Sequence, residues 1–600
     1  MSLSSNFPTI KPSLNLDFAN TKRLDPRVTF TRSTTGTYYD GVTTAKAEEN
    51  LVYYSQEFDN GVWTPVNTSI VANNTTAPDG TATADKVVIA ANTSYHDAFA
   101  NAFPRVANQQ YTHSIYVKAG TGIPAVYFYT NRDAVGLIAK FDISAGTYIG
   151  NAGADGYAAF DSYSITSVGS GWYRITATFT AASNSNSTFT LGISTTTTNT
   201  VVPITGNGTD FCYIWGAQLE QRSSATAYTV TTTQPITNYI PVLLTAAANV
   251  PRFDHNPTTD ESLGLLIEEQ RTNLSLYSSQ FDNAQWTQSG ATITANTVVA
   301  PDGTITGDKI VENTSNAAHY LFQLSSAAAG TYSLSAYMKA AGRSFGWLYA
   351  YTGASATAYF DLANGTVGTV SGTYSPTATI TSVGNGWYRC TMTFAATDSN
   401  FNFGAGVATA NGTNSYTGDG FSGIFIWGAQ LEAASFPTSY IATTSLAVTR
   451  TADAASMTGT NFTSWFNAGA GTFYGEANLS GSGRYFHTVK TGSSAQIEGV
   501  QQTTYFEAFV YTTDIQAQIN ISASSFINRR VAMAYQVNDI AACVSGGAVS
   551  VDTNAILPLD LNAFYVNSYG TSGPLGSGTV KKVAYYPARL TNAQLQAITS

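Results

Sequence analysis

Apolar and polar residues alternate along most of the chain, in stretches of about five to eight residues bounded by Gly, Asn and Asp. This period of two is typical of β-strands, because it places the apolar side chains on one face of a sheet. The segment Gly471–Leu479 is a clear example. The period of 3.6 that marks an amphipathic helix is rare, and we expect one short helix, Leu590–Ile598, with Thr591 as its N-cap. The pattern therefore predicts an all-β fold.

Two ten-residue stretches repeat each other with a single substitution: Ile165–Arg174 reads ITSVGSGWYR, and Ile380–Arg389 reads ITSVGNGWYR. In each stretch the central Gly-Ser-Gly or Gly-Asn-Gly supplies the positive φ angles that a tight turn needs. The flanking β-branched and aromatic residues favour strands on either side. Both stretches are therefore predicted to be β-hairpins.

The hairpins belong to a much longer repetition. A segment that starts at Asn50 recurs from Asn273, 223 positions later, and the spacing has shrunk to 212 where Trp427 repeats Trp215. A gradual shrinkage indicates deletions in loops between retained strands. The repeated unit is about 170 to 180 residues long, which is too long for a solenoid repeat. We predict two copies of one fold, each closed as a two-sheet sandwich or jelly roll.

The remaining segments differ from the duplicated unit. Residues 1–50 contain few apolar side chains and are interrupted by Pro8, Pro12 and Pro26, so they are expected to pack on later domains of the chain or on a partner. The predicted order is an N-terminal docking arm over 1–50, a first jelly roll over 51–230, a connector over 231–270, a second jelly roll over 271–443 and a different sandwich over 460–600.

Composition agrees with this fold class and argues against several functions. Charged residues make up 11% of the chain, while 36 Tyr and 31 Phe supply bulk suited to sheets with uncharged polar faces. The net charge is −10 and no basic cluster occurs, so we expect no nucleic-acid partner. Cys212, Cys390 and Cys543 lie far apart and are expected to be small buried residues rather than disulfide partners.

Signals for membranes, export and common catalysis are also missing from the sequence. No apolar run approaches the roughly 18 residues of a membrane span, so we expect no membrane insertion. The N-terminus lacks a basic stretch followed by an apolar one, which predicts synthesis in a cytoplasm without a standard export signal. None of the five His lies within five residues of another, and no zinc, phosphate-binding or nucleophilic-serine motif occurs. We therefore expect no catalytic residue, no metal site and no cofactor.

Acidic residues leave two alternatives open. A glycan-cleaving enzyme needs an acid and a base or nucleophile about 5 to 10 Å apart. The candidates are Glu268 with Glu269, Asp260 with Glu261, and Glu220 with its copy Glu432. Adjacent carboxylates on a strand point to opposite faces, so we favour structural hydrogen bonds or salt bridges for these residues. The other alternative is structural calcium, with turn capping as the favoured role of its candidates, Asp79, Asp302, Asp254 and Asp260.

Most tryptophans are shared by the two copies. Six of the eight occur at matched positions, namely 63 and 286, 172 and 387, and 215 and 427, which favours a role in the common core. Two residues after Trp172 and Trp387, Arg174 and Arg389 lie on the same strand face, where each guanidinium can cover a neighbouring ring. A sugar-binding platform at these positions is the alternative.

A second aromatic pattern is the better candidate for a binding site. Trp347, Tyr349 and Tyr351 alternate with other residues, so their side chains project from one face of a strand, and Tyr127 and Tyr129 take similar positions in the first copy. Such a flat strip with hydroxyl groups suits stacking on sugar rings. The alternative is that this face is the inner one, where the rings would fill the sandwich.

Several motifs resemble tailed-bacteriophage virion proteins of the tail-fibre and capsid-fibre kind. They are the opening Leu24–Ser33, the connector Pro251–Glu268, Arg271–Leu274 and the Trp-Gly-Ala-Gln-Leu-Glu closures at 215–220 and 427–432. In that group the duplicated units are similar to carbohydrate-binding-module jelly rolls. The last 140 residues, which end with Tyr-Tyr-Pro-Ala-Arg-Leu, resemble a concanavalin-like or laminin-G-like sandwich. One departure is that the first jelly roll separates the opening from the connector, which are nearly contiguous in the group.

The resemblance implies a structural adhesion protein of a virion, assembled in the host cytoplasm, that binds host surface glycans through many weak contacts. It implies a symmetric homo-oligomer, most often a trimer, attached to other virion proteins through the N-terminal arm. A glycan depolymerase and a capsid decoration protein without a ligand are the alternatives. Attachment to the head or to the tail is left open.

Overall fold

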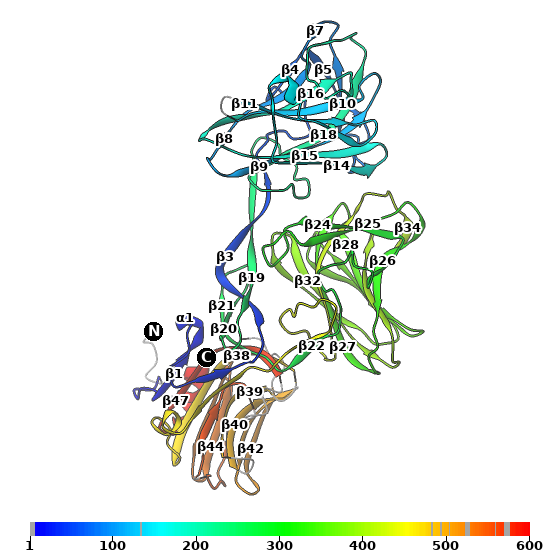
Figure 1. Ribbon diagram of the computed structural model, residues 1–600. Coiled ribbons are helices and arrows are strands. Elements are labelled where there is room, and N and C mark those ends of the chain that lie inside the picture. Colours follow the sequence, from blue (N-terminus) through cyan, green and yellow to red (C-terminus); the bar gives the residue numbers. More distant parts are fainter. Residues whose placement is uncertain are drawn as a thin grey trace.

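The computed structural model describes residues 7–132, 135–481, 484–491, 495–502, 504–522, 528–558, 560–568 and 576–600. Strands dominate this part of the chain, and its α-helices are short: α1 Phe18–Thr21, α2 Thr460–Thr463 and α3 Asn592–Thr599. None of the described helices is long and apolar enough to span a membrane. Figure 1 shows three bodies built from packed sheets. The predicted all-β class, with duplicated jelly-roll sandwiches followed by a lectin-like third sandwich, is confirmed.

The first sandwich packs the sheet β12-β11-β10-β16-β8-β4 against the sheet β14-β15-β9-β18-β6-β5, with β13 beside β11 and a small β7–β17 pair at one end. Its elements are β4 Trp63–Val66, β5 Thr68–Thr75, β6 Ala84–Ile89, β7 Thr93–Ser94, β8 Asp97–Arg105, β9 Gln110–Ala119, β10 Ala125–Arg132, β11 Val135–Asp142, β12 Thr147–Gly150, the 3₁₀ turn η1 Gly153–Asp155, β13 Ala158–Ala159, β14 Ser162–Gly169, β15 Trp172–Thr180, β16 Ser185–Ser194, β17 Ile204–Thr205 and β18 Phe211–Glu220.

The second sandwich repeats this strand order, as β30-β29-β28-β33-β26-β23 against β31-β32-β27-β35-β25-β24, with β34 beside β26. Its elements are β23 Thr287–Ser289, β24 Ala291–Val298, β25 Gly307–Glu312, β26 Asn316–Leu324, β27 Gly330–Ala341, β28 Phe345–Tyr351, β29 Ser355–Asp361, β30 Thr366–Ser371, β31 Thr377–Gly384, β32 Trp387–Ala396, β33 Asn402–Ala408, β34 Ser415–Thr417 and β35 Gly423–Glu432. The two copies therefore share one topology.

The repeated ten-residue stretches form the hairpins β14–β15 and β31–β32, as predicted. In the first hairpin Gly169, Ser170 and Gly171 have φ angles of 91°, 50° and 78°. Ser and Asn accept the left-handed conformation at the middle position, whereas the two outer positions need glycine more strongly. The local sequence is therefore sufficient to fix the turn and the register of each hairpin.

A buried carboxylate fastens the same two loops in each copy. Asp308 accepts hydrogen bonds from the backbone N–H groups of Phe281 and Asn296, both at 2.8 Å, and Asp85 makes the equivalent bonds in the first copy. Burial raises the pKa of Asp308 to about 6, and that of Asp85 also to about 6, against the lowering effect of these hydrogen bonds. Each carboxylate therefore joins the loop before its sandwich to an edge strand, which is β5 in the first copy and β24 in the second.

A long two-stranded ribbon carries the first sandwich. It pairs β3 Gly36–Asn50 with β19 Ile236–Ala246, and register shifts at two places in β19 mark irregularities in the pairing. In Figure 1 the ribbon runs from the third sandwich to the first, which sits at its far end. Strand β3 thus lies in the segment predicted as an arm, and β19 lies in the predicted connector.

The third sandwich collects strands from both ends of the chain and from the connector. One sheet is ordered β20-β21-β47-β38-β43-β44-β45 with β1 beside β47, the other is ordered β2-β37-β46-β39-β40-β41-β42, and a small β22–β36 pair links to the second sandwich. The elements are β1 Leu14–Asp17, β2 Thr29–Thr31, β20 Arg252–His255, β21 Ser262–Ile267, β22 Arg271–Asn273, β36 Val448–Arg450, β37 Ala454–Thr458, β38 Ala470–Gly481, β39 Arg484–Thr491, β40 Ala495–Gln501, β41 Tyr505–Tyr511, β42 Ile515–Ser522, β43 Arg529–Gln536, β44 Asp539–Val544, β45 Ser550–Asp552, β46 Ala563–Tyr565 and β47 Gly576–Tyr586.

The described part of the predicted N-terminal arm packs on a later domain of the same chain. Strand β1 pairs with β47, and β2 pairs with β37, so the described part of the first fifty residues belongs to the third sandwich and to the ribbon. Leu14, Leu16 and Phe18 are buried in the core of that sandwich. A short strand buries its apolar side chains only against a sheet, and here the partner strand in that sheet lies more than 500 positions away. Of the two alternatives for this segment, packing on later domains of the same chain therefore holds.

Candidate functional site

The predicted strip on β28 forms part of a larger aromatic surface on the second sandwich. We call this surface the platform, and its members are Tyr320, Phe322, Phe345, Trp347, Tyr349, Tyr351 and Tyr359. They come from three strands, β26, β28 and β29, which lie in one sheet. The core of the sandwich lies on the other side, where Leu348 and Ala350 of the same strand are buried. The alternative that the strip faces the core is therefore wrong.

Glycines let the platform lie flat. Strand β33 runs between β26 and β28, and the register pairs its Gly406 with Tyr320 on one side and with Trp347 on the other. A Cβ atom at Gly406 would lie 2.5 Å from Nε1 of Trp347, so a larger residue would push the indole off the sheet. Nε1 donates a hydrogen bond to the carbonyl of Val407 at 3.2 Å, which fixes the ring further.

The rings differ in what they offer to a ligand. Trp347 and Tyr349 are buried by their neighbours, with 4.9 Å between their ring centroids, so they support the platform rather than form its outer surface. Tyr351 is 52% exposed, and Tyr320 and Phe322 are half-buried. The accessible part of the platform is therefore formed by Tyr351 together with the half-buried Tyr320, Phe322 and Phe345. The sequence pattern did not identify Tyr320 and Phe322 because they lie on another strand, β26.

The equivalent surface of the first sandwich is covered. Tyr127 is buried with Ala152 and Val201, and Tyr129 is half-buried beside them. These two covering segments are joined by a hydrogen bond from the N–H of Val201 to Asp155 at 2.9 Å. The hydroxyl of Tyr127 donates to Asp97 at 3.0 Å. The sequence pattern therefore predicted that the two tyrosines share one face of the strand, but it did not show that loops cover this face.

Loop deletions distinguish the two copies at this surface. Phe141 and Trp172 are 31 positions apart, whereas their counterparts Phe360 and Trp387 are only 27 apart. The missing residues fall in the region of the covering turn η1, which has no counterpart among the elements between β30 and β31. The drift in repeat spacing therefore marks where the second copy lost part of its cover.

The matched tryptophans are buried. Trp172 and Trp387 have almost no exposed surface, which agrees with the buried structural role predicted for them, but they lie on the outer side of their sheets, in clusters separate from the cores between the sheets. The predicted position of the neighbouring arginines is also confirmed, because the guanidinium of Arg174 lies 5.4 Å from the ring centroid of Tyr116 and that of Arg389 lies 5.6 Å from Tyr337. These residues are not available for stacking on a ligand.

The candidate acid pairs have structural partners. Glu432 accepts hydrogen bonds from Gln430 and from both the N–H and the hydroxyl of Thr438, and Glu220 makes the same contacts in the first copy. Glu269 forms an ion pair with Arg271. Glu261 forms one with Lys581 at 2.7 Å. These contacts agree with the structural roles that we favoured for the carboxylates.

Glu268 belongs to a buried ionic network where the second and third sandwiches meet. Arg252 donates to Glu268 at 2.7 Å and to Asp453 at 2.5 Å, Arg450 also pairs with Glu268, and Arg32 donates to Asp453 at 3.1 Å. All five side chains are almost completely buried. Burial alone would raise the pKa of Glu268, but Arg450 and Arg252 outweigh that effect and lower the pKa to about 2. Glu268 therefore stays ionised, and the network joins three distant segments of the chain, around residues 32, 252–268 and 450–453.

Two of the four carboxylates considered for calcium, Asp79 and Asp302, cap turns in the described structure. Asp302 accepts from the N–H and the hydroxyl of Thr304, and Asp79 does the same with Thr81. Asp254 accepts from the N–H of Tyr39 at 2.9 Å. Among the described residues, no group of three His, Cys, Asp or Glu side chains is placed to hold a metal ion.

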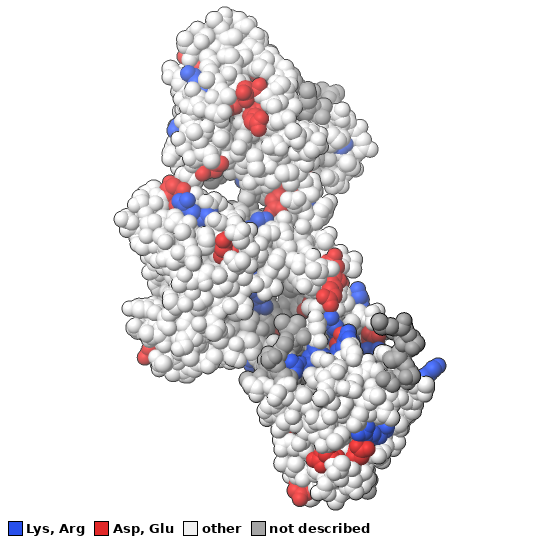
Figure 2. All heavy atoms as spheres, turned by 180° about the vertical axis from the view of Figure 1, so that it is seen from behind, with Lys and Arg blue, Asp and Glu red and all other residues white. Residues whose placement is uncertain are grey.

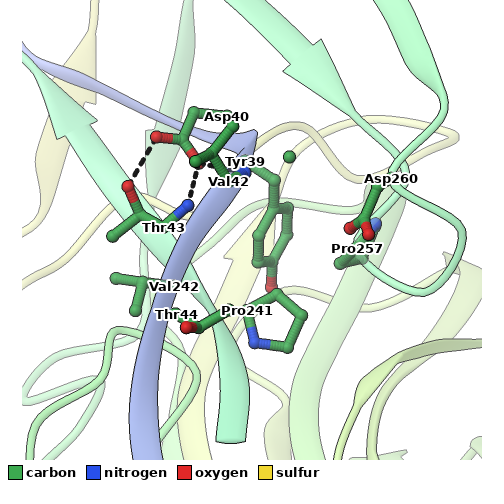
Figure 3. A pocket seen from close by; sticks show the side chains of 10 residues that line it. Tyr39, Asp40, Val42, Thr43, Thr44, Pro241, Val242, Pro257 and Asp260 are labelled. Carbon is green, nitrogen blue, oxygen red and sulfur yellow. Dashed lines mark hydrogen bonds between the residues drawn. The ribbon is translucent and has the colours of Figure 1, made fainter.

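A small cavity lies where the ribbon meets the connector (Figure 3). Asp40 folds back on the ribbon there, accepting from the hydroxyl of Thr43 at 2.6 Å, and Asp260 lies across the cavity from it. The volume of 60 Å³ has room for only a few waters, each of which occupies about 30 Å³. The cavity is therefore too small to hold a sugar ring.

A larger groove of 410 Å³ crosses the outer face of the third sandwich, and a volume of this size suits a small ligand, since ligand pockets span about 300 to 1,000 Å³. Its strands place Asp17, Lys582, Glu476 and Arg530 in one cross-strand row of alternating charge. Tyr474 and Tyr586 line it beside this row. Figure 2 shows Lys and Arg gathered near one end of the third sandwich, whereas the two jelly rolls carry few charges on that face.

An unusual carboxylate, which no sequence pattern indicated, lies on the other sheet of the third sandwich. Glu498 is 6% exposed, and its Oε2 has no hydrogen-bond partner within the described ranges. Burial raises the pKa of Glu498 to about 8, the charge of Glu507 adds to this rise, and Lys490 opposes it. Since the folded-state pKa lies above the ordinary value of 4.5, this group stabilises the fold fully below about pH 4.5, and that stability is lost as pH rises through 8.

Replacing Glu498 with glutamine should therefore stabilise the third sandwich at pH 8 by about 2 to 4 kcal/mol and leave its stability at pH 4 nearly unchanged. Thermal unfolding of both proteins at pH 4, 6 and 8 measures this difference. Glu261→Gln, at a partly exposed carboxylate, is the control and should show no comparable pH trend. A gain in stability that is equal at all three pH values would contradict the assignment.

Comparisons with protein-family models and with curated proteins find no match. Among solved structures, the chain is similar to the N-terminal CBM22-1–CBM22-2 tandem domain of Xyn10C from Paenibacillus barcinonensis, at 10% identity over 66% of this chain and 99% of that chain, with a TM-score of 0.19. It is also similar to the LG1–3 region of the laminin alpha2 chain, at 11% identity over 84% and 97%, with a TM-score of 0.17. Likenesses this weak carry no argument, so the fold described above rests on the strand pairing alone.

Proposed function

We propose that this protein is a non-enzymatic adhesion protein of a phage virion, in a tail or head fibre, and that the platform of the second sandwich binds host surface glycans. The observation that carries the proposal is the exposed aromatic part of the platform, on a sheet face with few charges. Aromatic rings stack on the apolar faces of sugar rings, and tyrosine hydroxyls can exchange hydrogen bonds with sugar hydroxyls. The assignment to a virion rests on the sequence motifs given above.

Weak contacts of this kind give firm attachment only when many of them form at once. A single platform offers a few rings and is expected to bind with low affinity, whereas several platforms on one particle raise the effective concentration of the second and later contacts. We therefore propose a symmetric homo-oligomer, a trimer by resemblance, joined to other virion proteins through the N-terminal region. The charged groove of the third sandwich is a second place where the same glycan chain can make contact.

Binding with and without the platform tests the proposal. The double variant Tyr351→Ala with Phe322→Ala should bind purified host envelope polysaccharide at least about tenfold more weakly, a loss of about 1.4 kcal/mol, because two stacking rings are removed. Titration calorimetry or biosensor binding measures the change. Tyr163→Ala, at an exposed ring of the first sandwich, is the control and should bind like the unchanged protein.

Two further readouts separate the alternatives. A depolymerase would shorten the polysaccharide and produce new reducing ends on incubation, whereas an adhesion protein leaves the chain length unchanged. A decoration protein would lie around the capsomers and bind no glycan. Antibody labelling of purified particles places the protein on the fibre, tail or capsid surface, and a location away from every fibre would argue against the proposal.

A further inference from the structure

The two jelly rolls differ in what covers their outer sheet. In the second sandwich, the ribbon packs on the outer face of the sheet that contains β32, β27 and β35. Tyr39, Ile240 and Leu243 of the ribbon form one apolar cluster with Trp387 and Trp427 of that sandwich. The ribbon and the second sandwich therefore pack against each other, although they are far apart in the sequence.

Specific contacts fix the ribbon on this face. A Cβ atom at Gly384, in the turn of the β31–β32 hairpin, would lie 2.7 Å from Pro241 of the ribbon, so the turn and the ribbon are in close contact. Lys339 forms an ion pair with Glu48 of the ribbon, and Asn385 donates to the same carboxylate at 2.9 Å. The face therefore recognises a β-ribbon through an apolar patch, a glycine turn and one cation.

The first sandwich carries the same face without a ribbon on it. Its counterpart cluster of buried residues consists of Ala77, Ala84, Trp172 and Trp215, and the residues packed against it come from the first sandwich as well. Gly169, the counterpart of Gly384, has nothing within 4 Å of a Cβ atom built on it. Lys118 occupies the position of Lys339 by its pairing with the hairpin. All three recognition elements are therefore present.

Residues on this outer face are more deeply buried in the sandwich that the ribbon covers. Four apolar residues on this face are buried in the second sandwich and only half-buried in the first: Val383 against Val168, Phe425 against Tyr213, Tyr337 against Tyr116, and Tyr440 against Tyr228. At the edge of the face, Gly80 of the first sandwich meets the ring of Phe421 from the second, so the two sandwiches touch there. The three residues of the hairpin turn, Gly169–Gly171, remain exposed.

The chain also supplies a ribbon with an uncovered side. Val42 and Tyr239, on the two strands of the ribbon, are 77% and 59% exposed. Asp40 lies beside Val42, and its carboxylate is held by the N–H groups of Val42 and Thr43. Val42, an exposed apolar residue next to a carboxylate, matches the apolar patch and Lys118 of the vacant face in chemistry, and Tyr239 adds an exposed ring farther along the ribbon, where it pairs with Lys46.

We infer that the outer face of the first sandwich, where the half-buried Tyr116, Val168, Tyr213 and Lys118 lie over the buried Trp172 and Trp215, is a docking site for the ribbon of a second copy of this chain. The contact is heterologous, because face and ribbon are different surfaces, so it produces a closed ring when the rotation between copies closes. This assembly contact does not involve the platform, so its failure and a failure of glycan binding are seen in different experiments.

Sedimentation or light scattering of the full chain tests the docking site. The unchanged protein should self-associate, and Val168→Asp with Tyr213→Asp should weaken that association at least tenfold, because two charges are buried in the contact. Val551→Asp, on an exposed strand of the third sandwich, is the matched control and should associate normally. A protein that is monomeric at all accessible concentrations, or an unchanged association of the double variant, would overturn the inference.

Cysteine cross-linking locates the contact without disturbing the fold. The native Cys212, Cys390 and Cys543 are buried, so introduced thiols are expected to dominate the reaction. Mixing Ser170→Cys with Tyr239→Cys should give a disulfide-linked pair of chains under mild oxidation. Mixing Ser170→Cys with Val551→Cys should give only the background yield. Equal yields in the two mixtures would contradict docking of the ribbon on the first sandwich.

Discussion

Replacing Arg252 with alanine should destabilise the junction of the second and third sandwiches by about 3 to 5 kcal/mol, because Glu268 and Asp453 would stay buried after losing a shared cationic partner. For a unit of about 200 residues this corresponds to a fall of roughly 10 °C in the melting temperature. Scanning calorimetry of the full chain should show the loss in the transition of the third sandwich. The transition of the first sandwich, which lies at the far end of the ribbon, should not move.

A surface pair provides the control for this variant. Arg27 and Asp25 form an ion pair at 2.8 Å with both side chains partly exposed. Arg27→Ala removes the same type of side chain and should cost less than about 1 kcal/mol, because water screens the pair and solvates the remaining carboxylate. Equal losses for the two variants would show that the buried network does not join the segments as described.

Replacing Trp387 with alanine should also cost about 3 to 5 kcal/mol, since a large buried ring is lost and the surrounding cluster relaxes only in part. Its indole donates to the carbonyl of Val299 at 3.1 Å and packs in the cluster that includes the ribbon. The variant should therefore unfold the second sandwich earlier and also loosen the ribbon. Hydrogen exchange followed by mass spectrometry should show faster exchange in β3 and β19.

The duplication supplies a matched control in the same chain. Trp172 donates to the carbonyl of Thr76 at 3.2 Å and is equally buried, but its cluster contains no ribbon residue. Trp172→Ala should destabilise the first sandwich by a similar amount without faster exchange in the ribbon. If both variants loosened the ribbon equally, the account of what the ribbon packs against would be wrong.

Local features could be predicted from the sequence because they depend on neighbours in the chain. The hairpin turns at Gly169–Gly171 and Gly384–Gly386 follow from residues that accept positive φ angles. The capping box that begins α3, in which Thr591 and Gln594 bond to each other's backbone N–H groups, follows from its own segment. The duplication was visible because buried tryptophans recur at matched positions whose spacing shrinks only gradually, from 223 to 212 residues.

Long-range partners could not be predicted in the same way. The pattern of Leu14 and Leu16 shows that one side of β1 is buried, but not that its partner is β47 near the other end of the chain. The strip at Trp347 has the same alternation whether it faces the core or the outside. Gly406 and the shortened loops decide that question, because they determine which face has room for the rings.

A crystal structure of the full chain with an oligosaccharide from the host envelope would show whether the platform binds glycans. We expect an intact saccharide stacked on Tyr351 and Phe322 of the second sandwich, with the first sandwich unoccupied at its covered counterpart. An empty platform with the saccharide bound only elsewhere, or a cleaved product held between two carboxylates, would contradict this expectation.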